Sequence, residues 1–190
     1  MSNYPNTGKG LKNMFIASIG SLVCIVLSII PFTTTISSAG TLLFLVLSLV
    51  GLWTVGKDLA ECKKAFWLTL VALVCDAIAN ALKAGSLAVV AMIFSLVGLA
   101  ATFGVTYYVC HSVGGVLRTL GHEDIAKTGD KTVTVVLWTT IASVVCSILC
   151  VIPALAAVGT VALLLVIIAG VVGTVFYMIF LNKAYKVFGA

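Results

Sequence analysis

The chain has 190 residues, of which 62% are hydrophobic and only 9% are charged. Soluble domains carry about a quarter charged residues, so the composition excludes a water-soluble globular protein and predicts one embedded in lipid. The net charge of +5 does not indicate a nucleic-acid partner, because the basic residues lie in short segments between apolar runs rather than on one basic face.

Six apolar runs follow the short N-terminal tail 1–12, and polar, charged or Pro-containing segments separate them. A helix needs about 20 residues to cross a bilayer, and lipid offers no partner for an unpaired backbone group. Each run is therefore predicted to form one transmembrane helix in a single domain, 1–190. The first run is too long for a signal peptide and is interpreted as a retained span. The runs are 13–31, 40–56, 65–82, 87–110, 133–152 and 155–181.

The basic residues predict the orientation of these spans. Ten of the eleven lie in the N-terminal tail or after the second, fourth and sixth runs, and only Lys83 lies on the other side. Basic residues beside spans stay in the cytoplasm, so both termini are predicted to be cytoplasmic. Trp and Tyr residues gather at the same ends, as interfacial anchors do. The simple targeting pattern favours a multi-pass protein of a bacterial plasma (inner) membrane.

The runs also resemble one another. Ser21–Pro31 and Ser143–Pro153 are identical at six of eleven positions, and Ser48–Leu52 repeats as Ser95–Leu99. Three helical hairpins are therefore predicted as copies of one unit, at about 13–64, 65–118 and 131–188. Every copy starts and ends on the same side, so the copies are parallel rather than inverted.

Small residues recur at helical spacing in these hairpins. In lipid, helices associate through such small faces, so these residues are predicted to pack helix against helix. The six cysteines lie inside apolar runs or at their cytoplasmic ends, which argues against a disulfide framework. The predicted packing residues are Ser21, Cys24, Ser28, Gly51, Gly98, Ser143, Cys146 and Gly170.

The third span carries polar and charged side chains on one face. Asp76 is the only acidic residue deep inside an apolar run, and Thr69, Asn80 and Lys83 fall on the same helical face. A carboxylate at this depth is costly unless it is protonated, paired or hydrated. The functional hypothesis is a site that exchanges a proton or cation, with Asn80 as a neutral ligand. The structural alternative is a pair between Asp76 and Lys83.

Other chemistry finds little support in the sequence. Segment 111–131 holds both histidines, but no ligand spacing of a metal site occurs there, and it is predicted to be a solvated loop. A pair of facing aspartates, a nucleophile elbow and a cofactor motif are all missing from the sequence. No catalytic residue, metal or cofactor is therefore expected, and the protein is not predicted to be an enzyme.

Two functions fit these features. The first is a small solute or ion transporter or channel, with Asp76 in its binding site. The alternative is a non-transporting partner of another membrane protein, such as an assembly, immunity-type or regulatory subunit, which acts through helix–helix contacts. A homo-oligomeric pore is a third, weaker hypothesis. The predicted partners are thus the lipid bilayer and either a second copy or another membrane protein, not nucleic acid.

Two families offer an outline resemblance. The three hairpins resemble mitochondrial carriers, but the Pro-x-acid-x-x-base signature of that family is absent after Pro31 and Pro153, which excludes it. Six spans in this length also resemble the substrate-binding subunits of energy-coupling-factor vitamin importers. No motif allows the residue roles of those subunits to be carried over.

Overall fold

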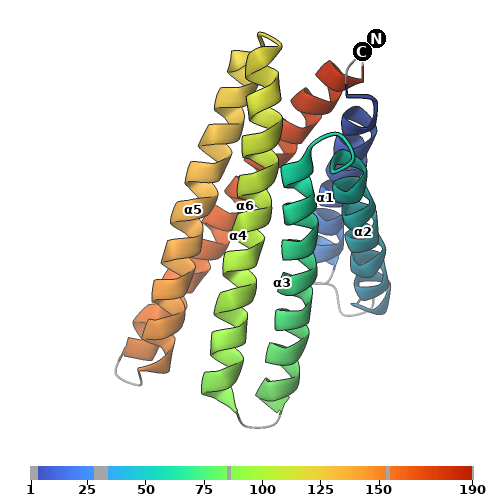
Figure 1. Cartoon of the computed structure of the whole chain (residues 1–190). Coiled ribbons are helices and arrows are strands. Elements are labelled where there is room, and N and C mark those ends of the chain that lie inside the picture. The colour runs from blue at the N-terminus through green and yellow to red at the C-terminus, as the bar shows by residue number, and fades with distance from the viewer. Residues whose placement is uncertain (1–3, 28–33, 85–86, 153–154, 190) are drawn as a thin grey trace.

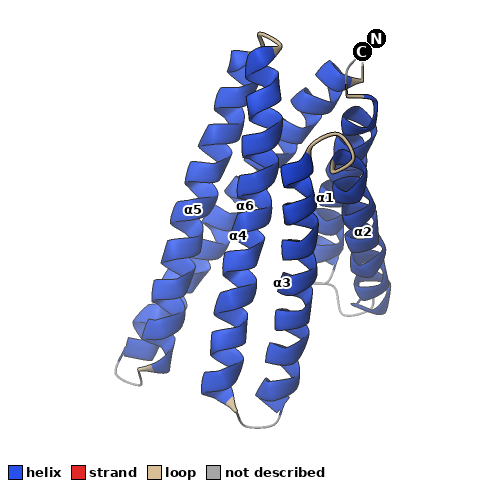
Figure 2. Ribbon diagram, in the orientation of Figure 1, coloured by secondary structure: helices blue, strands red, loops and turns tan. Residues whose placement is uncertain are grey.

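The computed structural model describes residues 4–27, 34–84, 87–152 and 155–189, and within them the chain is entirely helical apart from short connections (Figure 2). The described residues contain no strand. Their helices are α1 (Pro5–Leu27), α2 (Thr34–Val55), α3 (Ala60–Ala84), α4 (Ala88–Thr119), α5 (Glu123–Val151) and α6 (Ala156–Phe188).

Five of these helices are long and apolar enough to cross a membrane, and α2 contains a shorter apolar stretch, Ala39–Val55. Large apolar side chains cover their outer surfaces, among them Leu165 and Ile168 of α6. Such a surface would be unstable in water but is well solvated by lipid. These helices indicate a protein embedded in a membrane, as the composition predicts.

The six helices form a closed ring in chain order. Each helix packs against the next, and α6 returns to pack against α1. The chain termini lie together at one end of the bundle, with the connections 56–59 and 120–122 (Figure 1). We call this the terminal end and the opposite one the hairpin end. Of the neighbouring pairs, α2 and α3 touch least.

The main hydrophobic core lies at the terminal end. All six helices contribute to it, and Phe180 and Leu181 of α6 are completely buried in it. The other members are Leu11, Met14, Leu52, Val55, Cys62, Ala65, Val109, Cys110, Val113, Leu117, Ile125, Ala126, Ala184 and Phe188. Nearer the hairpin end, the buried described residues are small, such as Ala79 and Ala91.

Glycines bring α1 and α2 close together near this core. A Cβ atom at Gly10 would lie 2.6 Å from the carbonyl oxygen of Gly51, and one at Gly51 would lie 2.8 Å from that of Gly10. Both distances are shorter than any ordinary carbon–oxygen contact. The two backbones therefore touch directly, which is how small residues hold helices together in lipid.

The helices α1, α4 and α5 extend well beyond the predicted spans. The N-terminal tail is part of α1, which begins at Pro5 and buries Thr7 and Leu11. The prediction of a solvated loop at 111–131 is wrong, because α4 runs to Thr119, α5 begins at Glu123, and only 120–122 connect them. The helices continue because their apolar residues keep helical spacing past the end of the apolar run, and Val113, Leu117 and Ile125 join the core.

Candidate solute-binding cavities

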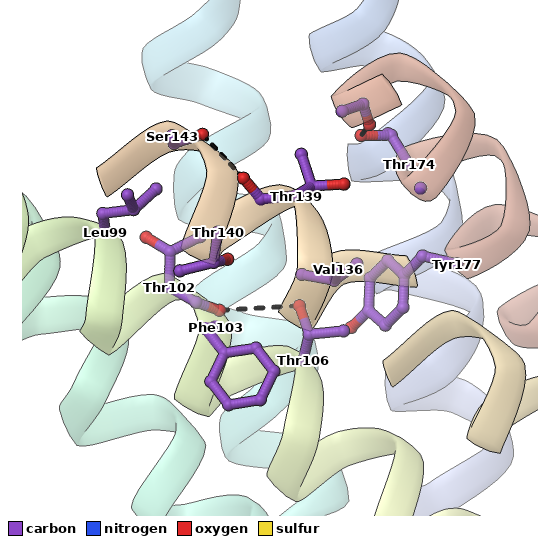
Figure 3. A pocket seen from close by; sticks show the side chains of 12 residues that line it. Leu99, Thr102, Phe103, Thr106, Val136, Thr139, Thr140, Ser143, Thr174 and Tyr177 are labelled. Atoms are coloured by element: carbon purple, nitrogen blue, oxygen red, sulfur yellow. Dashed lines mark hydrogen bonds between the residues drawn. The ribbon is translucent and has the colours of Figure 1, made fainter. Parts of the chain in front are cut away.

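On the hairpin-end side of the core, α4, α5 and α6 line a partly open cavity of about 200 Å³. Seven of its twelve lining residues carry a hydroxyl group, and no lining residue is charged. Figure 3 shows side chains of α4 and α5 converging with Thr174 and Tyr177 of α6 around this space. The hydroxyl residues are Thr102, Thr106, Thr139, Thr140, Ser143, Thr174 and Tyr177.

A second cavity of about 480 Å³ lies between α1, α2, α3 and α6. Gly170 and Thr174 of α6 line both cavities, so the two spaces adjoin and together all six helices contribute to their walls. The second cavity also has no charged lining residue. Its hydroxyl residues are Ser18, Ser21, Thr41, Ser48, Thr69 and Thr174.

Most of these hydroxyls are oriented by their own helices. Thr139 donates to the carbonyl oxygen of Val135 at 2.8 Å, and Ser143 donates to that of Thr139 at 2.9 Å (Figure 3). Thr174 and Thr102 make the same bond to Gly170 and Gly98, each at 3.0 Å. A Ser or Thr hydroxyl in a helix satisfies its hydrogen in this way, and its oxygen keeps lone pairs for a further partner.

The predicted ion-binding stripe on α3 begins at the second cavity. Thr69 lines that cavity, and Asp76 lies seven residues further toward the hairpin end, on the same helical face. A Cβ atom at Gly98 would lie 2.9 Å from Oδ1 of Asp76, so the carboxylate lies against the backbone of α4. Asp76 itself is exposed, and within the described residues its side chain has no hydrogen-bond or ion-pair partner.

Asn80 and Lys83 continue the stripe toward the hairpin end, and both are exposed. The ion pairs among the described residues join Arg118 to Asp130 and Lys127 to Glu123. The structural alternative, a pair between Asp76 and Lys83, is therefore not formed in this part of the chain. The structure brings Thr69 to a cavity, whereas Asp76 lies two helical turns further along α3, outside the lining of both cavities and without an ionic partner among the described residues.

The residues predicted to pack helices divide into two groups. Cys24, Gly51, Gly98 and Cys146 are buried, whereas Ser21, Ser143 and Gly170 line the cavities. A Cβ atom at Gly170 would meet only a methyl group of Thr139, at 3.8 Å, so α6 makes no tight contact there. Ser28 lies outside the described residues.

At the terminal end, an aspartate that was not predicted from the sequence links the start of α1 to the connection after α2. Asp58, in the connection after α2, accepts hydrogen bonds from the backbone N–H groups of Asn6 and Thr7, both at 2.8 Å. It also accepts bonds from the Asn6 amide at 2.8 Å and the buried Thr7 hydroxyl at 3.0 Å. Asp58 thus caps the start of α1 from more than fifty residues away. The sequence did contain a signal for such a cap: Tyr4, which precedes Pro5, is not a capping residue, so the start of α1 needs a partner from elsewhere in the chain.

These bonds set the charge state of Asp58. Partial desolvation raises the pKa of its carboxyl group, but the hydrogen bonds from Asn6 and Thr7 outweigh that effect. The pKa is therefore lowered from the ordinary 3.8, and the carboxylate is the form that the helix start stabilises. Its negative charge also interacts favourably with the positive end of the α1 helix dipole.

The described residues contain no cluster of His, Cys, Asp or Glu that would hold a metal ion. The six cysteines are free thiols. The cavity walls offer hydroxyl oxygens and aromatic rings, and Asp76 adds a carboxylate outside them. Comparison with protein-family models, with curated proteins and with solved structures finds no match for this chain.

Proposed function

We propose that the protein is a small transporter that binds a solute or ion in the two adjoining cavities. The observation that carries the proposal is the hydroxyl lining to which all six helices contribute. Pure packing would fill this space with apolar side chains, because empty volume between helices loses dispersion contacts. Pockets between the helices of a bundle, mostly apolar with a few well-placed polar groups, are common sites for small molecules, and the walls of these two cavities are mainly apolar surface that includes several hydroxyl oxygens.

The position of the core supports one-sided access to this site. Every lining residue lies on the hairpin-end side of the core residues of its own helix, for example Thr139 beyond Ala126 and Tyr177 beyond Phe180. The packed core closes the path to the terminal end. A solute would therefore enter from the hairpin end or between helices, and release at the terminal end would require the core to open.

We further propose that the three helix pairs α1–α2, α3–α4 and α5–α6 are parallel copies with both termini in the cytoplasm of a bacterial plasma membrane. The sequence identities between Ser21–Pro31 and Ser143–Pro153 support the copies. In two of the pairs a glycine of the second helix also lies against a cysteine sulfur of the first, Gly40 against Cys24 and Gly159 against Cys150, although these two cysteines are about one helical turn apart in the aligned sequences. The excess of basic residues at the terminal end supports the orientation. In this orientation, a solute that enters from the hairpin end would come from outside the cell.

Flux through proteoliposomes tests the transport proposal. Wild-type protein should dissipate an imposed proton or cation gradient, and Asp76→Asn should reduce the rate roughly tenfold or more, because an uncompensated membrane carboxylate is the natural coupling group. Asp124→Asn, an exposed acid at the terminal end, is the matched control and should transport like the wild type.

If neither the wild type nor Asp76→Asn produced gradient flux over a range of pH values, and the two proteins were equally stable to heat, the transport proposal would be refuted. The non-transporting membrane partner would then be the better explanation, and co-purification from membranes would be the next experiment.

A further inference from the structure

The hydroxyl hydrogens in the cavity walls are largely committed to the backbone. In the first cavity Thr102, Thr139, Ser143 and Thr174 each donate to a carbonyl one turn back, and Thr106 does so at 3.5 Å. In the second cavity Ser18, Thr41 and Thr69 make the same bonds. Each of these oxygens can still accept a hydrogen bond but has no hydrogen left to donate. The walls therefore favour a ligand that donates.

The charges near the cavities favour a positive ligand. No Lys, Arg or His lines either cavity. Asp76 lies two helical turns beyond Thr69 on the same face, with no cationic partner among the described residues. A carboxylate in a lipid environment attracts cations and repels anions from a distance of several ångströms, because lipid screens its field weakly.

The size and the aromatic lining favour an organic ligand over a bare ion. A metal ion requires oxygen ligands at about 2.0–2.6 Å on several sides, whereas these cavities measure about 200 and 480 Å³. Phe103 and Tyr177 line the first cavity and Phe44 lines the second. Aromatic faces attract ammonium groups and also bury hydrocarbon.

We propose that the ligand is a small organic ammonium ion. Its N–H groups donate to the hydroxyl oxygens of Thr139, Ser143 and Thr174, and its hydrocarbon part packs against Phe103 and Val136. Asp76 provides the negative potential that concentrates the cation at the cavities. The inference rests on the proposed function, because it names the class of solute that the same cavities hold.

Calorimetric titration of the purified protein in detergent with three probes of matched size tests this inference. The probes are n-butylammonium, neutral butyramide and anionic butyrate. Butylammonium should bind saturably and roughly tenfold or more tightly than the other two, because a hydrogen bond to a charged group is about twice as strong as a neutral one.

Two threonines of α5 supply a matched pair of variants. Thr139→Val removes a cavity oxygen and should weaken butylammonium binding roughly tenfold. Thr134 makes the same backbone bond, to Asp130 at 3.0 Å, but is exposed and lines neither cavity, so Thr134→Val should bind like the wild type. Thr174→Val provides a second cavity variant and should behave like Thr139→Val.

Three results would overturn the inference: equal or tighter binding of butyramide or butyrate, no saturable binding of butylammonium, or equal effects of the Thr139 and Thr134 variants. These outcomes are separable from failure of the proposed function. Gradient flux that depends on Asp76 but shows no preference for ammonium would leave transport standing and reject only the ligand class.

Discussion

At the terminal end, all six helices bury large side chains against one another, whereas toward the hairpin end the buried described residues are mainly alanine, cysteine and glycine. Phe180 and Leu181 are inaccessible at the first end, while Gly170, ten residues before Phe180 on the same helix, lines both cavities. One helix thus changes from core to cavity wall within three turns.

Polar links between elements follow the same division. At the terminal end, Asp58 caps α1, the Ser112 hydroxyl donates to Glu61 at 2.9 Å, and Arg118 pairs with Asp130. The cavity hydroxyls bond within their own helices, and toward the hairpin end the Ser37 hydroxyl of α2 donates to the carbonyl oxygen of Cys24 of α1 at 2.5 Å. Most of the described polar links between elements thus lie at the terminal end, and we expect that end to hold the ring together while the interior beyond it binds the proposed solute. Stability and binding should therefore respond to mutations at different places.

The largest expected contrast is between two apolar residues of α6. Phe180→Ala should lower the free energy of unfolding by on the order of 3 kcal/mol, because it opens a cavity in the core. Leu164→Ala, at a position that is 60% exposed to the surroundings, should change it by less than about 0.5 kcal/mol. Unfolding by SDS titration, followed by circular dichroism, measures both. Equal losses would mean that the bundle is not anchored at the terminal end.

A smaller contrast separates two helical glycines. Gly10→Ala places a methyl group against the backbone of Gly51 and Val55, and such overpacking costs about 1–3 kcal/mol. Gly115→Ala, in α4, meets no atom within 4 Å and should stabilise the protein by about 0.5–1 kcal/mol through helix propensity. The apparent Tm in one detergent should move in opposite directions. A stable Gly10→Ala would show that α1 and α2 do not touch there.

The helices themselves follow from the sequence, because a long apolar run in lipid has no other way to satisfy its backbone. The positions at which α1, α4 and α5 begin or end do not follow from it in the same way. The mean hydropathy falls where polar residues begin, while the apolar face of the helix continues past that point. Leu11 and Ile125 show this, as both belong to the core yet lie outside the predicted spans.

The cavities were beyond sequence reasoning for a different reason. Small and hydroxyl residues at helical spacing look the same whether they face a neighbouring helix or a space. Gly51 and Gly170 occupy equivalent places in the second helices of their hairpins, each eleven residues after another glycine, Gly40 or Gly159. Yet Gly51 touches Met14 and Gly10, while Gly170 lines both cavities. The tilt and the separation of the helices decide between these outcomes, and a local sequence pattern predicts neither quantity.

The smallest predicted effect concerns Asp58 and depends on pH. Asp58→Ala leaves the first N–H groups of α1 and the buried Thr7 hydroxyl without their acceptor, which should cost about 1–2 kcal/mol at neutral pH. Because folding lowers the pKa of Asp58 below 3.8, its contribution is fully present above that value and is lost as the pH falls through the folded pKa. The wild type should therefore lose more stability than Asp58→Ala between neutral and strongly acidic pH.

Asp124→Ala is the matched control, because Asp124 is an exposed acid in the first turn of α5. Its removal should cost no more than a few tenths of a kcal/mol, from the helix dipole alone. Tm measured against pH for the three proteins distinguishes these cases. If the curves of wild type and Asp58→Ala ran parallel down to strongly acidic pH, the cap would not hold α1 to the connection after α2, and the terminal end would depend on its apolar core alone.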